Sequence, residues 1–246
     1  MQETASKLVK WLQEQIQLTG VKGLVVGVSG GIDSAVVANL IKRAAPNNSL
    51  GVMMPCNSNP QDLIHAKSVV NAAGIDHITV DLTNTHIVML KEIQEQLTQA
   101  NVFNKENDRL TDANLRARLR MSTLYSVATN HNYLVVGTDN AAEWFTGYFT
   151  KYGDGGVDLG PLIHLTKEEV KQLAQYLNVP KEVINKKPSA GLWEGQTDEN
   201  EMGTSYAMID SYLKGNEIPE KDKRIIEQLH KRSAHKRELP KTPEKL

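Results

Sequence analysis

Short apolar runs alternate with amphipathic segments along the first 140 residues, and this alternation restricts the possible folds of the chain most strongly. The apolar runs are only a few residues long and rich in valine, isoleucine and leucine, as is typical of strands buried in a parallel sheet. The segments between them have apolar residues at helical spacing, so each can return the chain across the sheet as a helix. We expect strands at 23–29, 50–55, 77–82 and 133–139, and helices at 2–18, 33–45, 60–73, 84–100 and about 110–130.

This pattern predicts an α/β fold with a doubly wound, mainly parallel sheet and helices on both faces, a Rossmann-like arrangement. The sheet is expected to have five strands, one more than the four ranges above. Neither an internal repeat nor a second domain boundary interrupts the chain, so residues 1–246 are predicted to form a single domain. Beyond residue 150, Thr166 and Glu169 form a capping box for one more helix, and a last helix is expected over 219–236. The polar segment 186–204 is too long for an ordinary connection and is predicted to be a lid that orders when a ligand binds.

The composition excludes several classes of protein. Lysine and arginine number 28 against 29 aspartates and glutamates, which gives no case for a general nucleic-acid binder. The chain has no apolar run near the roughly 18 residues of a membrane helix, and its first residues lack the apolar core of a secretory signal. We therefore expect a soluble, cytoplasmic protein. The single cysteine, Cys56, excludes an internal disulfide and is interpreted as a small residue after a strand.

A glycine-rich loop stands between a predicted strand and a predicted helix in the run VVGVSGGIDSAVVANL. Gly30 and Gly31 allow positive φ and close approach of the backbone, so successive N–H groups can point at an anion. The N-terminus of the following helix adds further N–H donors and partial positive charge. The loop has neither the Gly-Lys-Ser/Thr of a Walker loop nor the G-x-G-x-x-G of a dinucleotide fingerprint. It is therefore either a different phosphate-binding loop or a Gly-Gly turn capped by Asp33.

Two acidic residues are candidates for metal binding. An acid inside a phosphate-binding loop would repel the phosphate, so Asp33 is predicted to bind Mg²⁺ that bridges protein and phosphate. If the first and fourth strands are neighbours, Thr138 and Ser29 border a crevice at the carboxyl edge of the sheet. Glu143 would then face Asp33 across that crevice, and the two carboxylates could share the cation with phosphates and water. The alternative for Glu143 is an exposed residue of a solvated helix.

Two motifs carry a resemblance to known families. The run SGGIDS at 29–34 resembles the signature of the ATP pyrophosphatases, which cleave ATP to AMP and pyrophosphate on an adenine nucleotide alpha hydrolase-like fold. The run VVGTDNAAEWFTGYFTKYGDGGVDLGPL at 135–162 is similar to the NAD synthetase pattern GTDxAAExxTGFFTKYGDGGxDxxPL over nearly its whole length. Further agreement occurs at 114–121, 186–190 and 235–237. The chain is thereby identified as a member of the ammonia-dependent NAD synthetases.

The resemblance implies a ligase that amidates deamido-NAD, the last step of NAD biosynthesis. The nicotinate carboxylate would attack the α-phosphorus of ATP to form an acyl-adenylate, and ammonia would then displace AMP to give NAD. Mg²⁺ is the implied cofactor, ATP the co-substrate and a homodimer the implied assembly. Glutamine-dependent relatives carry an extra amidase domain, for which 246 residues leave no room, so ammonia is the expected nitrogen donor.

The resemblance also assigns roles to individual residues. The implied catalytic residues are Asp33, Glu143 and Lys167, and the first two would bind the metal. ATP would be bound by Gly27, Val28, Ser29, Gly30, Gly31, Ile32, Asp33, Ser34, Thr138, Lys167 and Ser189. At the last of these the family usually has threonine, so the hydroxyl is kept. Deamido-NAD would be bound by Arg118, Lys151, Asp158, His235 and Lys236.

The basic residues of the substrate site have an alternative interpretation. Arg116 and Arg120 are four residues apart and share a helix face, whereas Arg118 points about 200° away from that face. All three cannot serve one site on a regular helix, so at least one can belong to a solvated face. A charged tail such as that around His235 and Lys236 is also usually solvated. A substrate site at a homodimer interface, as in the family, would give the tail a function.

Two other functions compete with the NAD synthetase. One is another ATP pyrophosphatase, such as a tRNA-modifying enzyme or a GMP synthetase-like core. A tRNA enzyme would be expected to show a concentrated basic face, and sulfur-transferring versions commonly need reactive cysteines. The other alternative is a non-catalytic nucleotide-binding module, which would have no reason to keep Asp33, Glu143, Lys151 and Asp158 together.

Overall fold

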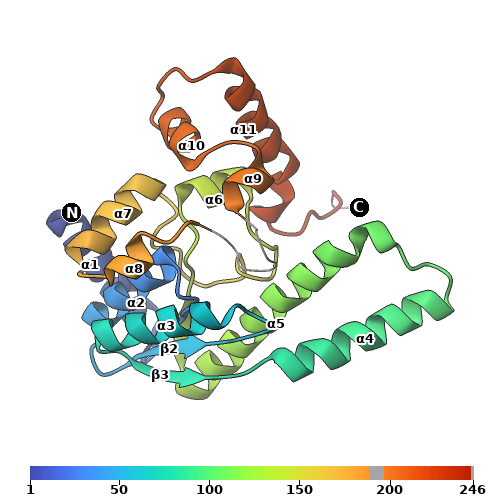
Figure 1. Cartoon of the computed structure of the whole chain (residues 1–246). Coiled ribbons are helices and arrows are strands. Elements are labelled where there is room, and N and C mark those ends of the chain that lie inside the picture. Colours follow the sequence, from blue (N-terminus) through green and yellow to red (C-terminus); the bar gives the residue numbers. More distant parts are fainter. Residues whose placement is uncertain (189–196, 245–246) are drawn as a thin grey trace.

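A parallel sheet forms the centre of the protein, as a computed structural model that describes residues 1–188 and 197–244 shows (Figure 1). Its strands lie in the order β3-β2-β1-β4, and every pair of neighbours is parallel. The first and fourth strands are thus neighbours, which is the condition for the predicted crevice between Ser29 and Thr138. The bounds are β1 Gly23–Gly27, β2 Ser49–Met53, β3 Asp76–Thr79 and β4 Tyr133–Val136.

The prediction of five strands is wrong for the described residues, in which the sheet has four. Next to β4, where a further strand would pair, Leu159 makes only an isolated parallel bridge with Val136. The Gly137 N–H donates to the Leu159 carbonyl at 2.7 Å, but Gly160 and Pro161 follow at once. Because proline has no N–H to donate and glycine weakens a strand, the pairing stops there.

Helices cover both faces of the sheet because the side chains of each strand alternate between the faces. Leu24 and Val26 of β1 are fully buried in the cluster that also contains residues of α1 (Gln2–Thr19), α2 (Ile32–Ala44) and α7 (Lys167–Tyr176). Val25, which points the other way, is buried against the cluster that contains Ala128 of α5 (Asp108–His131). The predicted doubly wound α/β arrangement is therefore confirmed apart from the strand count.

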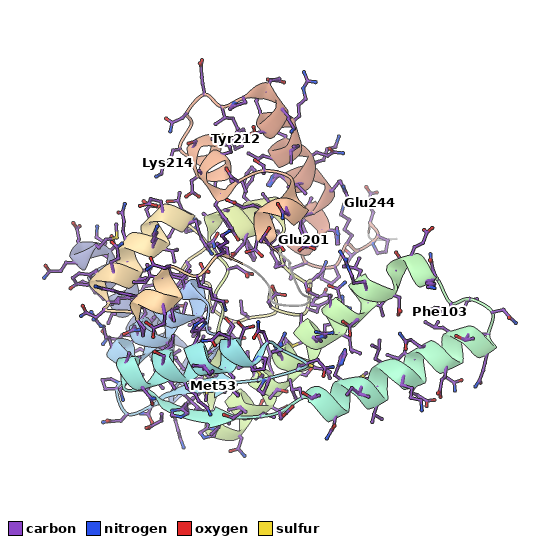
Figure 2. All side chains as sticks on the ribbon, viewed as in Figure 1. Met53, Phe103, Glu201, Tyr212, Lys214 and Glu244 are labelled. Carbon is purple, nitrogen blue, oxygen red and sulfur yellow. The ribbon has the colours of Figure 1, made fainter. Side chains whose placement is uncertain are left out.

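Helices α4 and α5 form an antiparallel hairpin that extends beyond the sheet, joined through the short 3-10 helix Lys105–Asn107 (Figure 1). Phe103 lies at the tip of this hairpin (Figure 2). Helix α4, Thr83–Gln99, has only His86 fully buried, whereas its neighbours Val88 and Met89 are 68% and 46% exposed. The hairpin therefore presents apolar side chains that the described chain does not cover.

The last helices form a separate layer above α6 (Figure 1). Their shared cluster contains Ala142 of α6, Met202 of α9, Tyr206 and Ile209 of α10, and Ile226 of α11. The helix predicted over 219–236 ends at Arg232, and a 3-10 turn, Ala234–Lys236, follows it. The remaining bounds are α3 Pro60–Ala73, α6 Ala141–Thr146, α8 Lys181–Ile184, α9 Asp198–Met202, α10 Tyr206–Leu213 and α11 Glu220–Arg232.

Across residues 1–188 and 197–244, every helix is too short or too polar to span a membrane.

Candidate active site

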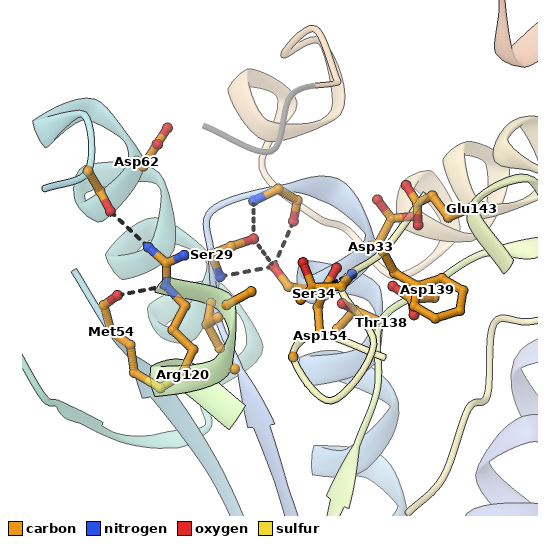
Figure 3. Close-up of a pocket in the computed structure, with 18 of the residues that line it drawn as sticks. Ser29, Asp33, Ser34, Met54, Asp62, Arg120, Thr138, Asp139, Glu143 and Asp154 are labelled. Carbon is orange, nitrogen blue, oxygen red and sulfur yellow. Dashed lines mark hydrogen bonds between the residues drawn. The ribbon is translucent and has the colours of Figure 1, made fainter. Parts of the chain in front are cut away.

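A cavity of about 960 Å³ opens at the carboxyl edge of the sheet. The segments that follow β1, β2 and β4 line it, together with the inner face of α5 and the first residue of α7. Figure 3 shows Ser29 and Ser34 beside the acidic residues Asp33 and Glu143, with Arg120 on the other side of the cavity. Ligands of parallel α/β proteins bind at this edge of the sheet.

The loop after β1 is held in shape by its own hydrogen bonds. The Ser34 hydroxyl lies 3.1 Å from the Ser29 hydroxyl, accepts from the Ser29 N–H at 3.2 Å and donates to the Gly31 carbonyl at 3.0 Å. Gly30 has φ +79°, and a Cβ there would lie 2.5 Å from the Asp62 carbonyl oxygen of α3. Glycine is thus required at this position for two reasons: it adopts the positive φ, and it leaves room for the close approach of α3.

Asp33 and Glu143 meet at one ammonium group. Lys167 Nζ lies 2.6 Å from Asp33 Oδ2 and 3.4 Å from Glu143 Oε1, and all three side chains are less than a fifth exposed. The capping box of α7 places Lys167 here, because Thr166 accepts from the Glu169 N–H and so begins the helix at Lys167. The expectation that Glu143 faces Asp33 across the crevice is confirmed.

The side chains of Asp33, Glu143 and Lys167 lie close to further carboxyl groups, and these neighbours and burial shift pKa values in the site. Burial raises the pKa of Glu143 to about 7, although Lys167 opposes this rise. Burial and the nearby charges of Asp154, Glu143 and Asp33 raise the pKa of Asp139 well above its ordinary value. Burial alone would lower the pKa of Lys167, but Asp33 and Glu143 outweigh it and raise that pKa. The carboxyl groups therefore outnumber the one ammonium group, and a further cation would reduce the repulsion between them.

The residues fit Mg²⁺, which prefers carboxylate oxygens and keeps several ligands from phosphate and water. Asp33 and Glu143 supply such oxygens at 2.6 and 3.4 Å from Lys167 Nζ. Within the described ranges, no group of three or more histidine, cysteine or acidic side chains is arranged to hold a metal by itself. A cation at this position would therefore take its remaining ligands from ATP and water.

Comparison with known proteins agrees with this geometry. A family model described as NAD synthase matches residues 4–240. An NH(3)-dependent NAD(+) synthetase of Alkaliphilus oremlandii (strain OhILAs) is 58% identical over 243 residues, which cover 99% of this chain and 97% of that protein. The chain belongs to the NAD synthase family. It is therefore an enzyme of the ligase class, and this membership supports the NAD synthetase over the two competing functions.

Solved structures lead to the same family. An NMN synthetase of Francisella tularensis superposes with a TM-score of 0.92 and 40% identity, covering 99% of this chain and 98% of that one. An NH3-dependent NAD synthetase of Campylobacter jejuni, in complex with the nitrate ion, gives a TM-score of 0.78 and 28% identity with the same coverage. Both likenesses include the sheet and the C-terminal helices, since they cover nearly the whole chain.

Most of the residues expected to bind ATP line the cavity. Those are Gly27, Val28, Ser29, Gly31, Ile32, Asp33, Ser34, Thr138 and Lys167. Gly30 is instead turned towards α3 and shapes the loop. Ser189 lies outside the described residues, as does the middle of the predicted lid. Their roles stay predictions.

The residues expected to bind deamido-NAD are divided. Lys236 lines the cavity, and its ammonium donates to the carbonyls of Gly147 at 2.8 Å and Phe149 at 2.6 Å. The Lys151 ammonium contacts the His235 carbonyl, so the tail is folded back onto the loop after α6. Arg118, Lys151, Asp158 and His235 are not among the described residues that line the cavity.

Asp158 and Arg118 are placed outside the cavity by particular contacts. Asp158 accepts from the Val135 N–H at 2.8 Å and from the Tyr125 hydroxyl at 3.0 Å, so it holds β4 to α5. Arg118 reaches the Lys151 carbonyl at 3.4 Å on the exposed side of α5. In this chain alone, neither the Asp158 carboxylate nor the Arg118 guanidinium is directed at the phosphate-binding loop after β1.

The prediction from helix geometry that Arg118 points away from Arg120 is confirmed. Arg120 lines the cavity, where its guanidinium donates to the Met54 carbonyl and the Ser58 hydroxyl, each at 3.1 Å. Arg116, on the same face as Arg120, is paired with Asp112. Sequence reasoning placed Arg120 on a possible site face but gave it no role.

Sequence reasoning missed two further residues of the acidic centre, the cluster of Asp33, Glu143 and Lys167. Asn140 is fully buried, and its Nδ2 donates to Asp33 Oδ1 at 3.0 Å while its backbone N–H donates to Glu143 Oε2 at 3.0 Å. The sequence could have indicated that Asn140 is the N-cap of α6, but not that it contacts Asp33, 107 residues away. Tyr206 contacts Glu143 from α10, and no pattern in the sequence indicated it.

Proposed function

We propose that this chain is an ammonia-dependent NAD synthetase, which uses ATP and Mg²⁺ to convert deamido-NAD and ammonia into NAD, AMP and pyrophosphate. The observation that carries the proposal is the meeting of Asp33, Glu143 and Lys167 beside the phosphate loop, in a chain 58% identical to a curated protein of that name.

The chain's own residues account for binding and orientation. The N–H groups of the Ser29–Ser34 loop and the N-terminus of α2 receive the phosphates of ATP. Lys167, held between two acids, supplies a fixed positive charge where charge develops on the leaving pyrophosphate. Asp33 and Glu143 would hold Mg²⁺, which when bound neutralises the phosphates and polarises the P–O bonds. No side-chain nucleophile is required, because the substrate carboxylate attacks the α-phosphorus.

The positively charged side chains of the site would bind the anionic groups of the substrate. Deamido-NAD is anionic at its pyrophosphate and at its carboxylate, and Arg120 and Lys236 line the same cavity. Adenylation converts the carboxylate into an activated carbonyl, and ammonia then adds to that carbonyl and expels AMP.

The test is an assay for products with purified chain, ATP, Mg²⁺, deamido-NAD and ammonium. We expect stoichiometric NAD, AMP and pyrophosphate, with little turnover when glutamine replaces ammonium. Release of ADP and phosphate, or ATP cleavage that does not depend on deamido-NAD, would contradict the proposal.

A second candidate substrate is nicotinate mononucleotide, whose amidation would give NMN. The observation that favours it is the TM-score of 0.92 to an NMN synthetase, against 0.78 to the NAD synthetase of Campylobacter jejuni. Both substrates present the same carboxylate, and they differ by the adenylate half. A comparison of kcat/KM for deamido-NAD and nicotinate mononucleotide, under one set of conditions, decides between them.

The homodimer belongs to this proposal, and we place its interface on the α4–α5 hairpin. On the exposed surface of this hairpin, Val88 and Met89 of α4 and Leu110 of α5, 61% exposed, are apolar, and Arg118 of α5 is exposed as well. A second copy on this surface would bring Arg118 and neighbouring residues towards a shared substrate site. We expect Val88→Glu to shift the mass measured by light scattering from dimer to monomer and to lower activity. A wild-type monomer at assay concentration would contradict the assembly.

We also place the enzyme in the cytoplasm. Cys56, its one cysteine, is free and buried, which suits a reducing compartment.

A further inference from the structure

Tyr206 connects the C-terminal helices to the acidic centre. It is the first residue of α10, directly after the N-cap Ser205, and it is 5% exposed. Its hydroxyl lies 2.9 Å from Glu143 Oε1 on α6 and 2.8 Å from Asp198 Oδ2 on α9. The residue lies outside every motif that identified the family.

The hydroxyl is the nearest donor to one oxygen of Glu143. Oε2 of that carboxylate accepts from the Asn140 N–H at 3.0 Å, which the capping box of α6 fixes. Oε1 has Lys167 Nζ at 3.4 Å and the Tyr206 hydroxyl at 2.9 Å. Of these two contacts, Oε1 would lose the shorter one without the hydroxyl, and the carboxylate could turn about its last bond.

The ring of Tyr206 is explained by packing, but its hydroxyl is not. The ring packs in the cluster with Ala142, Met202 and Ile209, where phenylalanine would serve equally well. The hydroxyl is directed between two carboxylates, where it can donate its one hydrogen to only one of them at a time. Lys167 Nζ also lies 4.7 Å from the centre of the ring, so the tyrosine borders the ammonium as well.

We propose that Tyr206 is a positioning residue for catalysis, whose hydroxyl holds Glu143 in the orientation that meets Lys167 and the ATP-bound cation, and ties that orientation to Asp198 of α9. The inference rests on the proposed function of Asp33, Glu143 and Lys167. The layer of helices α9, α10 and α11 thereby sets the geometry of the site.

The first test compares Tyr206→Phe with Tyr212→Phe. Tyr212 lies on the same helix, and its hydroxyl contacts Glu227 at 3.3 Å, away from the cavity. We expect Y206F to lower kcat about tenfold, the size of one lost hydrogen bond to a charged group, with KM for ATP and deamido-NAD within about twofold. Y212F is expected to keep wild-type kcat. A kcat for Y206F equal to that of Y212F would overturn the proposal.

A double-mutant cycle separates positioning from packing. In the Glu143→Gln background, Tyr206→Phe is expected to have little further effect on kcat, because the group that the hydroxyl positions has already been altered. If the hydroxyl acted only through the packing of α10, its effect would be the same in both backgrounds. Equal effects would therefore overturn the proposal.

A third measurement needs neither turnover nor a folded Y206F variant. In ¹³C-tyrosine-labelled protein without ATP or Mg²⁺, the Cζ resonance of Tyr206 is expected to shift in Glu143→Gln and not in Glu227→Gln. An unchanged resonance in Glu143→Gln would show that the hydrogen bond is absent and would overturn the proposal. A wild-type chain that forms neither NAD nor NMN would instead overturn the proposed function, whatever the resonance does.

Discussion

The phosphate loop and the acidic centre beside it are assembled in different ways. In the described chain, the hydrogen bonds that the Ser29 and Ser34 hydroxyls make within the loop join residues at most five apart. In the centre, Lys167 meets Glu143 across 24 residues and Asp33 across 134. The loop is therefore specified by a short run of sequence, whereas the centre exists only when α2, α6 and α7 have packed together.

This difference gives the two regions different sensitivities. A local loop keeps its shape as long as its own residues are present and fit against α3, so its failures should come from backbone strain, from a clash with α3 or from loss of a loop side chain. The centre depends on which side chains fill the space between distant elements, so it should fail when a positioning group is changed at constant backbone. The predictions that follow test this contrast, from the largest effect to the smallest.

Asp33 belongs to both regions, so its substitution should have the largest effect. We expect Asp33→Asn to lower kcat about a thousandfold, because it removes the charge that faces Lys167 and would bind the cation. The fold should persist, since an asparagine could still occupy this position in the first turn of α2. The exposed Asp76→Asn on β3 is the control for the loss of one carboxylate. AMP release measures kcat, and near-normal turnover of D33N at ordinary Mg²⁺ would refute the role.

Asn140 tests the centre without touching the loop. Asparagine and aspartate both cap helices well, so Asn140→Asp should preserve α6. It replaces the donor 3.0 Å from Asp33 Oδ1 by an acceptor, which turns a hydrogen bond into repulsion. We expect kcat to fall about a hundredfold through misplacement of Asp33.

The matched control for that substitution is Asn104→Asp, because Asn104 caps the short 3-10 helix of the hairpin by accepting from the Glu106 N–H at 2.9 Å. It should leave kcat unchanged. If N140D also has wild-type kcat, the centre does not depend on its distant contacts and the contrast with the loop fails.

The sequence alone was sufficient for the features that depend on local signals. Alternating strands and helices predicted a parallel sheet with helices on both faces, and the βα turn at Gly30 predicted the phosphate loop. The approach of Glu143 to Asp33 followed from the pairing of two strands, because their carboxyl ends must meet at one edge.

The rest depends on packing that no local pattern encodes. Tyr206 reads as an ordinary apolar position at the start of a helix, and its partner Glu143 is 63 residues away. The extra strand was expected because the fold class favours one, but Gly160 and Pro161 stop the pairing at a single bridge. The positions of Arg118 and Asp158 outside the cavity likewise follow from tertiary contacts.

Gly30 tests the loop at constant side-chain chemistry, with the smallest expected effect on catalysis. Gly30→Ala strains a backbone with φ +79° and drives a Cβ against the Asp62 carbonyl, whereas Gly215→Ala at φ +78° meets open space. Each should lose about 1–2 kcal/mol of unfolding free energy from the left-handed backbone alone. Only G30A should also raise the KM for ATP, about tenfold, the effect of roughly 1.4 kcal/mol of lost binding. Denaturant unfolding and initial rates measure the two quantities. An equal KM for ATP in G30A and G215A would mean that the contact of the loop with α3 does not set its phosphate-binding shape.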